Sequence, residues 1–133
     1  MVSFDVTTRS PTEMVDVTDR VQAAVRTSGV ENGICLVFVP HTTAGLTVQE
    51  NSDPDVQKDL LAALAHAAQE GLPSGYRHAE GNGPAHVKTS LVGNSTTILI
   101  DGGELVLGVW QGIYLCEFDG PRTRRVLVKA IRG

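Results

Sequence analysis

The spacing of apolar residues divides the first half of the chain into strand-like and helix-like segments. Val17, Val21 and Val25 recur at helical spacing, which predicts a helix over 17–28 that ends at Gly29. An unbroken apolar run over 34–39 is typical of a strand buried on both faces. Shorter strands are predicted over 2–8 and 46–49.

The clearest helix pattern follows these strands. Asp53 is placed to cap its start, Pro54 suits the first helical position, and Gly71 and Pro73 end it. One face collects its apolar residues: Val56, Leu60, Leu61, Leu64, Ala67 and Ala68. His66 falls on the opposite face, so we interpret it as a solvated surface histidine.

The second half of the chain reads as a long loop followed by strands. Residues 71–84 are rich in glycine, proline and charge, and a loop of that length in a compact domain is often functional. Strands are predicted over 86–91, 96–101, 104–107, 112–119 and 125–131, with a hairpin turn at 101–103. These elements predict one α+β domain over 1–133, a mostly antiparallel, jelly-roll-like β-sandwich with two helices packed on the sheet.

Composition narrows the class of protein. The 133 residues are 41% hydrophobic but only 5% aromatic, so the core is built mainly from aliphatic side chains. A net charge of -4 argues against nucleic acid as a partner, and no apolar run reaches the length of a membrane span. No signal peptide is evident, so we expect a soluble cytoplasmic protein. Cys35 and Cys116 lie in apolar runs and are interpreted as buried free thiols.

Three of the four histidines, His41, His78 and His86, occupy polar, loop-like stretches. Histidine is a common zinc ligand and changes charge near neutral pH, so the three indicate a metal or acid/base site. The spacing is not a standard zinc motif. Glu50 and Glu80 are candidate catalytic bases that would activate a bound water, and Glu80 is equally well explained as a surface charge.

Further polar residues are candidates for binding a ligand, each with a structural alternative. Thr42 and Thr43 offer hydroxyls to a phosphate, and Asn51 is either a ligand or a turn residue. The remaining candidates are Lys88, Trp110, Gln111 and Arg122. Lys88 is also compatible with simple exposure, Trp110 with a core or interface position, and Arg122 with an ion pair to Asp119.

Several of these segments occur in one order that resembles a known family. The segments are Pro40-His41-Thr42-Thr43-Ala44, Glu50-Asn51-Ser52-Asp53-Pro54, Tyr76-Arg77-His78, Asn82-x-Pro84-Ala85-His86, Gly108-Val109-Trp110-Gln111 and Glu117-Phe118-Asp119-Gly120-Pro121-Arg122. The combination resembles the YjbQ family, known as secondary thiamine-phosphate synthases. The family usually has Thr or Glu where this chain has Val109.

The resemblance implies a homotrimer with a site near the subunit boundary, built around His41, His78 and His86 and holding a divalent metal such as zinc. The implied reaction couples hydroxymethylpyrimidine diphosphate to a thiazole phosphate and releases pyrophosphate. Two alternatives remain open: a metal-dependent hydrolase of a small phosphorylated molecule, and a non-catalytic trimeric ligand-binding module. No carboxylate cluster suited to Mg²⁺ is evident.

Overall fold

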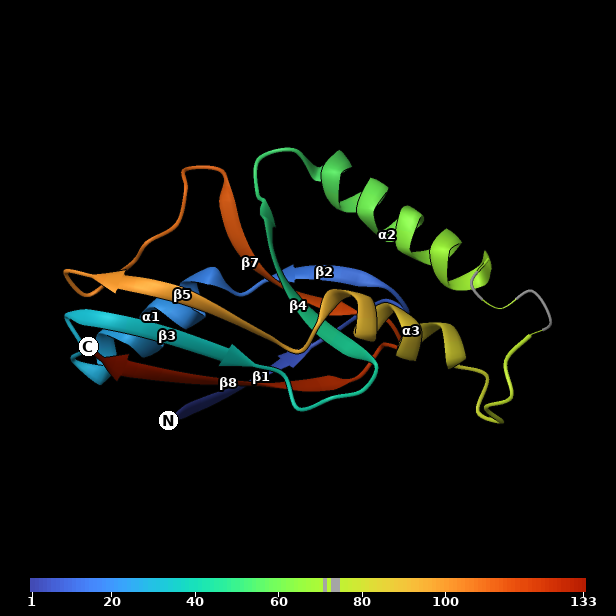
Figure 1. The fold of residues 1–133 in the computed structure, drawn as a ribbon, viewed down its shortest axis with the longest axis horizontal. Coiled ribbons are helices and arrows are strands. Elements are labelled where there is room, and N and C mark those ends of the chain that lie inside the picture. The colour runs from blue at the N-terminus through green and yellow to red at the C-terminus, as the bar shows by residue number, and fades with distance from the viewer. Residues whose placement is uncertain (71, 73–74) are drawn as a thin grey trace.

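The computed structural model describes residues 1–70, 72 and 75–133 and confirms the predicted α+β fold (Figure 1). The elements are β1 (Val2–Thr7), β2 (Glu13–Asp16), α1 (Thr18–Ser28), β3 (Asn32–Phe38), β4 (Ala44–Glu50), α2 (Pro54–Glu70), α3 (Gly83–Val92), β5 (Ser95–Asp101), β6 (Glu104–Leu105), β7 (Gln111–Glu117) and β8 (Thr123–Arg132). None of the described helices is both long and apolar enough to cross a membrane.

The strands form two antiparallel sheets that share one core. The larger sheet has the order β1-β8-β3-β5-β6 and the smaller β2-β7-β4. Aliphatic side chains from both sheets and from α1 meet between them, including Val37, Val126, Ile113, Leu115 and Val25. Because strand side chains alternate between faces, each sheet contributes one set of alternate residues to this core.

Several helix and turn boundaries lie where short sequence signals predict them. Gly29 adopts the left-handed conformation (φ 71°) that ends α1, as predicted. Gly102 and Gly103 have φ values of 59° and 79°, and Asp101 pairs with Glu104 across a tight hairpin turn. The Asp53 carboxylate accepts a hydrogen bond of 2.9 Å from the backbone N–H of Asp55, which confirms its capping role.

The predicted strand over 86–91 is wrong, because this segment forms α3, the third helix of a chain for which two were predicted. Pro84 lies at the start of that helix, where its missing N–H and fixed φ are tolerated. Packing against α2 and β4 then determines the conformation of a segment with no clear apolar period. The sequence also gave no signal for β2, a four-residue strand that pairs with β7.

The prediction that β3 is buried on both faces does not hold within one chain. Cys35 and Val37 are buried, whereas Ile34 and Leu36 are half-buried and Phe38 is exposed. Leu99 on the neighbouring β5 is 61% exposed. The outward face of the larger sheet therefore carries apolar side chains, and we call it the outer sheet face.

Helix α2 lies to one side of the sheets and packs mainly on α3 (Figure 1). Leu61 and Leu64 contact a second, smaller apolar cluster around Phe118 and Cys116. His66 is exposed, as predicted. Cys35 and Cys116 are buried free thiols, and burial raises the pKa of Cys35 to about 11 and that of Cys116 to about 12.

Candidate functional site: a cationic pocket beside His41

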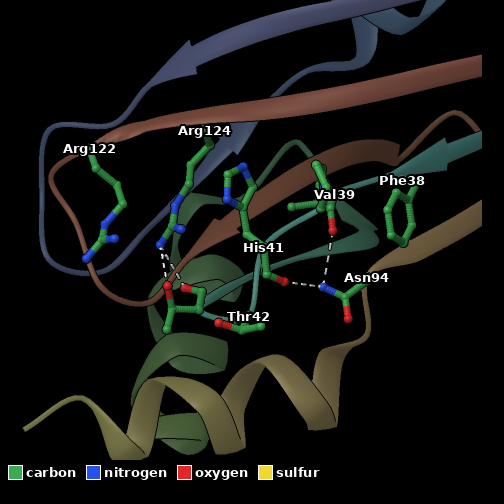
Figure 2. Close-up of a pocket in the computed structure, with 9 residues that line it drawn as sticks. Phe38, Val39, His41, Thr42, Asn94, Arg122 and Arg124 are labelled. Carbon is green, nitrogen blue, oxygen red and sulfur yellow. Dashed lines mark hydrogen bonds between the residues drawn. The ribbon is translucent and has the colours of Figure 1, made fainter. Parts of the chain in front are cut away.

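A polar pocket of about 450 Å³ lies at the end of β3, and we call it the His41 pocket (Figure 2). Its lining comprises Phe38, Val39, Pro40, His41, Thr42, Thr43, Asn94, Arg122 and Arg124. The side chain of Asn94 donates a hydrogen bond of 2.7 Å to the His41 carbonyl, and the Asn94 carbonyl accepts one of 2.8 Å from the Val39 N–H. These bonds fix the loop that carries His41.

The His41 imidazole is held in a defined orientation and charge state. Its Nε2 accepts a hydrogen bond of 2.9 Å from the backbone N–H of Arg125. A ring nitrogen that accepts a hydrogen bond carries no proton, so the neutral imidazole of His41 has its proton on Nδ1. Burial lowers the pKa of His41, and repulsion by the Arg124 guanidinium lowers it further. His41 is thus suited to donate a hydrogen bond from Nδ1 to an anion.

A buried ion pair between Arg124 and Glu117 lies at the base of the His41 pocket. Arg124 donates from Nε to Glu117 (2.9 Å) and from Nη2 to the Thr43 hydroxyl (2.8 Å) and the Thr43 carbonyl (3.1 Å). The Thr8 hydroxyl donates to Glu117 at 2.7 Å. Burial opposes ionisation of Glu117, but the hydrogen bonds from Arg124, the Asp119 backbone and Thr8 outweigh it, and the pKa of Glu117 is lowered.

Asp119 connects the His41 pocket to the start of α3. Its carboxylate accepts hydrogen bonds from Arg122 Nη2 (2.9 Å) and from the side-chain amide of Asn82 (2.8 Å). The Arg122–Asp119 ion pair anticipated from the sequence is confirmed, and Arg122 lines the pocket as well. Half of the Arg122 side chain remains exposed, so its guanidinium is accessible to a ligand.

The other two histidines lie close to each other, but His41 is in a different group. The rings of His78 and His86 meet edge to face with centroids 5.1 Å apart, and Glu80 lies 3.6 Å from His78 Nε2. Within the described residues, no three His, Cys, Asp or Glu side chains are grouped so as to hold a metal ion. One chain therefore does not assemble the three-histidine set, and the Nε2 lone pair of His41 is already used.

A third set of sequence candidates lies at the opposite end of β4 from His41. Glu50 ends β4 and pairs in register with Gln111. The Asn51 side chain donates to the Gln111 carbonyl (3.2 Å), and the Asn51 N–H donates to the Trp110 carbonyl (2.9 Å). Trp110 is 60% exposed on the loop before β7. Because β4 has seven residues, about 20 Å of strand separates this group from the His41 pocket.

Sequence reasoning placed Lys88 among the ligand residues, and the structure puts it away from the His41 pocket. It lies on the buried side of α3 and lines a different pocket, between α2 and α3. It is only 7% exposed. The exposed alternative considered for Lys88 is therefore wrong.

Sequence reasoning assigned no site role to Arg124, Glu117 or Asn94. A signal was present for the first two, because Arg124 is in phase with the buried residues Val126 and Val128, and Glu117 continues a buried run in β7. A charged residue in phase with core residues of a strand indicates a buried partner. Asn94 follows α3, an element predicted as a strand, and its role depends on contacts that sequence spacing does not reveal.

Comparison with known proteins agrees with this architecture, an α+β domain of two antiparallel sheets. The model of the family described as UPF0047 protein YjbQ-like matches residues 2–133. The chain belongs to this family.

Relatives and solved structures match over almost the whole chain. The UPF0047 protein YugU of Bacillus subtilis is 45% identical over 96% of both chains. A UPF0047 protein of Methanocaldococcus jannaschii is 44% identical over 98% of this chain and 94% of its own. A YjbQ/UPF0047 crystal structure from Clostridium acetobutylicum superposes with a TM-score of 0.91 at 47% identity, covering 98% and 100% of the two chains. A protein of unknown function from Sulfolobus solfataricus gives 0.92 at 34% identity, covering 99% and 96%.

The buried ion pair predicts an asymmetric response to mutation. Arg124→Met leaves Glu117 buried without its cation and is expected to lower the free energy of unfolding by about 3–5 kcal/mol, measured by urea denaturation. The double variant Arg124→Met/Glu117→Leu is expected to be more stable than Arg124→Met, because no uncompensated charge remains. Arg125→Met, at an exposed side chain, is the control and should change stability by less than about 0.5 kcal/mol. A double variant less stable than Arg124→Met would contradict this account.

Proposed function

We propose that the protein binds and transforms small phosphorylated molecules in the His41 pocket. The observation that carries the proposal is the set of hydrogen-bond donors at that pocket: the Arg122 and Arg124 guanidinium groups and the His41 imidazole line it. Arg124 is paired with buried Glu117, whereas Arg122, paired with Asp119, keeps about half of its side chain exposed. Arginine is well suited to phosphate because its planar donors match two oxygens at once. Figure 2 shows Arg122 and Arg124 side by side, with Thr42 and His41 next to them.

Within this class, we propose the secondary thiamine-phosphate synthase reaction of the YjbQ resemblance, in the cytoplasm. The thiazole ring nitrogen bonds to the methylene carbon of hydroxymethylpyrimidine diphosphate. The carbon–oxygen bond breaks, and its electron pair leaves on pyrophosphate. Because negative charge grows on the leaving group, preorganised cations and donors accelerate such a step. Arg122 is the accessible cation, Arg124 holds Thr43 and the pocket floor, and the His41 Nδ1–H donates to a phosphate oxygen.

We also propose that a divalent cation accompanies the phosphorylated substrate. This chain offers His78 and His86 to it, because their rings already lie together. His41 does not fit the same ligand set within one chain, since its Nε2 accepts from Arg125. When bound, the cation would supply Lewis-acid stabilisation of phosphate oxygens.

A homotrimer is the proposed assembly. Its support is the outer sheet face, where Phe38, Leu99 and Ile131 expose apolar surface that a monomer rarely leaves uncovered. Phe38 also lines the His41 pocket, so a partner on this face would lie next to the pocket. That arrangement agrees with a site at the subunit boundary.

The decisive experiment mixes purified protein with hydroxymethylpyrimidine diphosphate and thiazole phosphate and measures both thiamine phosphate and pyrophosphate. We expect both products in equal amounts. His41→Ala should lower kcat about 100-fold through loss of a donor to the developing charge. Arg122→Gln should raise the KM for the diphosphate at least about tenfold, as expected for loss of a charged hydrogen bond.

His66→Ala is the matched control, because His66 is exposed on α2. It should leave kcat and the KM for the diphosphate unchanged. Absence of thiamine phosphate with every divalent cation tried would refute the synthase proposal. Release of phosphate from one substrate alone would then identify a hydrolase, and binding without turnover would identify a binding module.

Metal content tests the cation proposal separately. Dialysed wild-type protein reconstituted with zinc is expected to retain about one ion per chain by inductively coupled plasma mass spectrometry. His78→Ala/His86→Ala should lose it, because both imidazoles are removed. His66→Ala controls for surface binding. Equal zinc content in the double variant and the wild type would rule out these two residues as ligands.

Sedimentation tests the assembly. The molecular mass of the wild-type protein from sedimentation equilibrium should be three times the 14.1 kDa of one chain. Leu99→Glu places a charge on the outer sheet face and should yield monomers, while Ala23→Glu, on the exposed side of α1, should remain trimeric. A monomeric wild type at micromolar concentration, or a trimeric Leu99→Glu variant, would show that this face is not the interface.

A further inference from the structure

A second pocket lies between α2 and α3, apart from the His41 pocket. Its volume is about 440 Å³, and Ala65, Gln69, Leu72, Gly75, Tyr76, Pro84 and Lys88 line it. We call it the Lys88 pocket. Apolar and aromatic groups dominate these walls, and Lys88 is the one cation among the lining residues. A mainly apolar pocket with few polar groups is typical of small-molecule sites.

Lys88 is unusual because its side chain is buried, while none of the described residues places a carboxylate against its ammonium. The side chain is 7% exposed, yet none of the ion pairs or hydrogen bonds among the described residues involves it. Its ammonium lies 5.2 Å from the centre of the Phe118 ring, a cation–π contact that offsets only part of the lost hydration. Burial accordingly lowers the pKa of Lys88.

The walls of the Lys88 pocket are held in place independently of any ligand. The Tyr76 hydroxyl donates to the backbone carbonyl of Ala68 on α2, which anchors the ring. The Tyr76 ring also lies directly against Gly83 at the start of α3, where any Cβ would collide with it. Because Tyr76 contacts both helices, it forms a fixed aromatic wall of the Lys88 pocket.

We propose that the Lys88 pocket is a second ligand site, which binds a small organic anion with an apolar body. The anionic group pairs with the Lys88 ammonium, and the apolar body lies against Tyr76, Leu72 and Pro84. A ligand carboxylate and a ligand phosphate ester share this chemistry. An inorganic anion lacks the apolar body and binds more weakly. The proposal stands independently of the reaction assigned to the His41 pocket.

The test uses Arg122→Gln protein, so that anion binding at the His41 pocket is weakened and the two sites are separated. Phenyl phosphate and benzoate are titrated into this protein, and binding is followed by amide shifts in ¹H–¹⁵N spectra. We expect saturable shifts at Tyr76 and at residues 85–89, and an at least tenfold weaker affinity for inorganic phosphate. A stronger response to phenyl phosphate than to benzoate identifies a phosphate ester as the preferred source, and the reverse identifies a carboxylate.

Adding Lys88→Met to the same protein should weaken binding of both probes at least tenfold. Lys58→Met is the matched control at an exposed lysine of α2 and should change nothing. Lys88→Arg retains the charge and should restore part of the affinity. Unchanged affinity in Lys88→Met, or shifts confined to residues 38–43 and 122–125, would overturn the proposal.

The stability of Lys88→Met provides a second, ligand-free readout. Removing a charge that has no anionic partner among the described residues should raise the unfolding midpoint in urea, because methionine needs no hydration and fills a similar volume. A lower midpoint would mean that an anion of the protein itself already compensates Lys88, and the pocket would then not need an anionic ligand.

Discussion

The buried Arg124–Glu117 pair is the interaction on which the rest of the site depends. Glu117 ends β7 in the smaller sheet, and Arg124 lies near the start of β8 in the larger one, so the pair joins the two layers where the core gives way to loops. Thr8 and Thr43 complete it from the segments after β1 and before β4. A core of aliphatic side chains has no directional preference, whereas these hydrogen bonds allow one relative position of the four segments.

The hydrogen bonds of that network keep the His41 pocket rigid. Thr43 is bound by Arg124, and two residues before it the His41 carbonyl is bound by Asn94, so the intervening loop is fixed at both ends. Because the loop is fixed, the His41 imidazole stays within hydrogen-bond distance of the Arg125 N–H. Preorganised donors cost no rearrangement when a ligand's charge develops, and a pocket on a rigid strand end can therefore discriminate between charge states.

Sequence patterns predicted the elements whose determinants are local. Gly29, the Gly102-Gly103 turn and the Asp53 cap act within a few residues, and each was located correctly. Helix α3 and strand β2 were not, because packing on α2 and β4, or pairing with the distant β7, determines their conformation. The same limit applies to the site. His41 and Arg122 were identified as candidates from residue type, but their juxtaposition depends on the Arg124 network, whose partners are up to 109 residues apart.

The placement of the motif residues has a consequence for how they act together. His41 and the Asn51–Trp110–Gln111 group lie at opposite ends of β4, about 20 Å apart, a span longer than one small phosphorylated molecule. Within one chain the two groups therefore cannot contact the same ligand. The proposed homotrimer offers another way to bring exposed Trp110 to a His41 pocket, because Phe38 belongs to both the outer sheet face and that pocket. In the proposed homotrimer, assembly and the composition of the site are therefore a single question, because a separated chain keeps His41 and Arg122 but has no neighbour's Trp110 beside them.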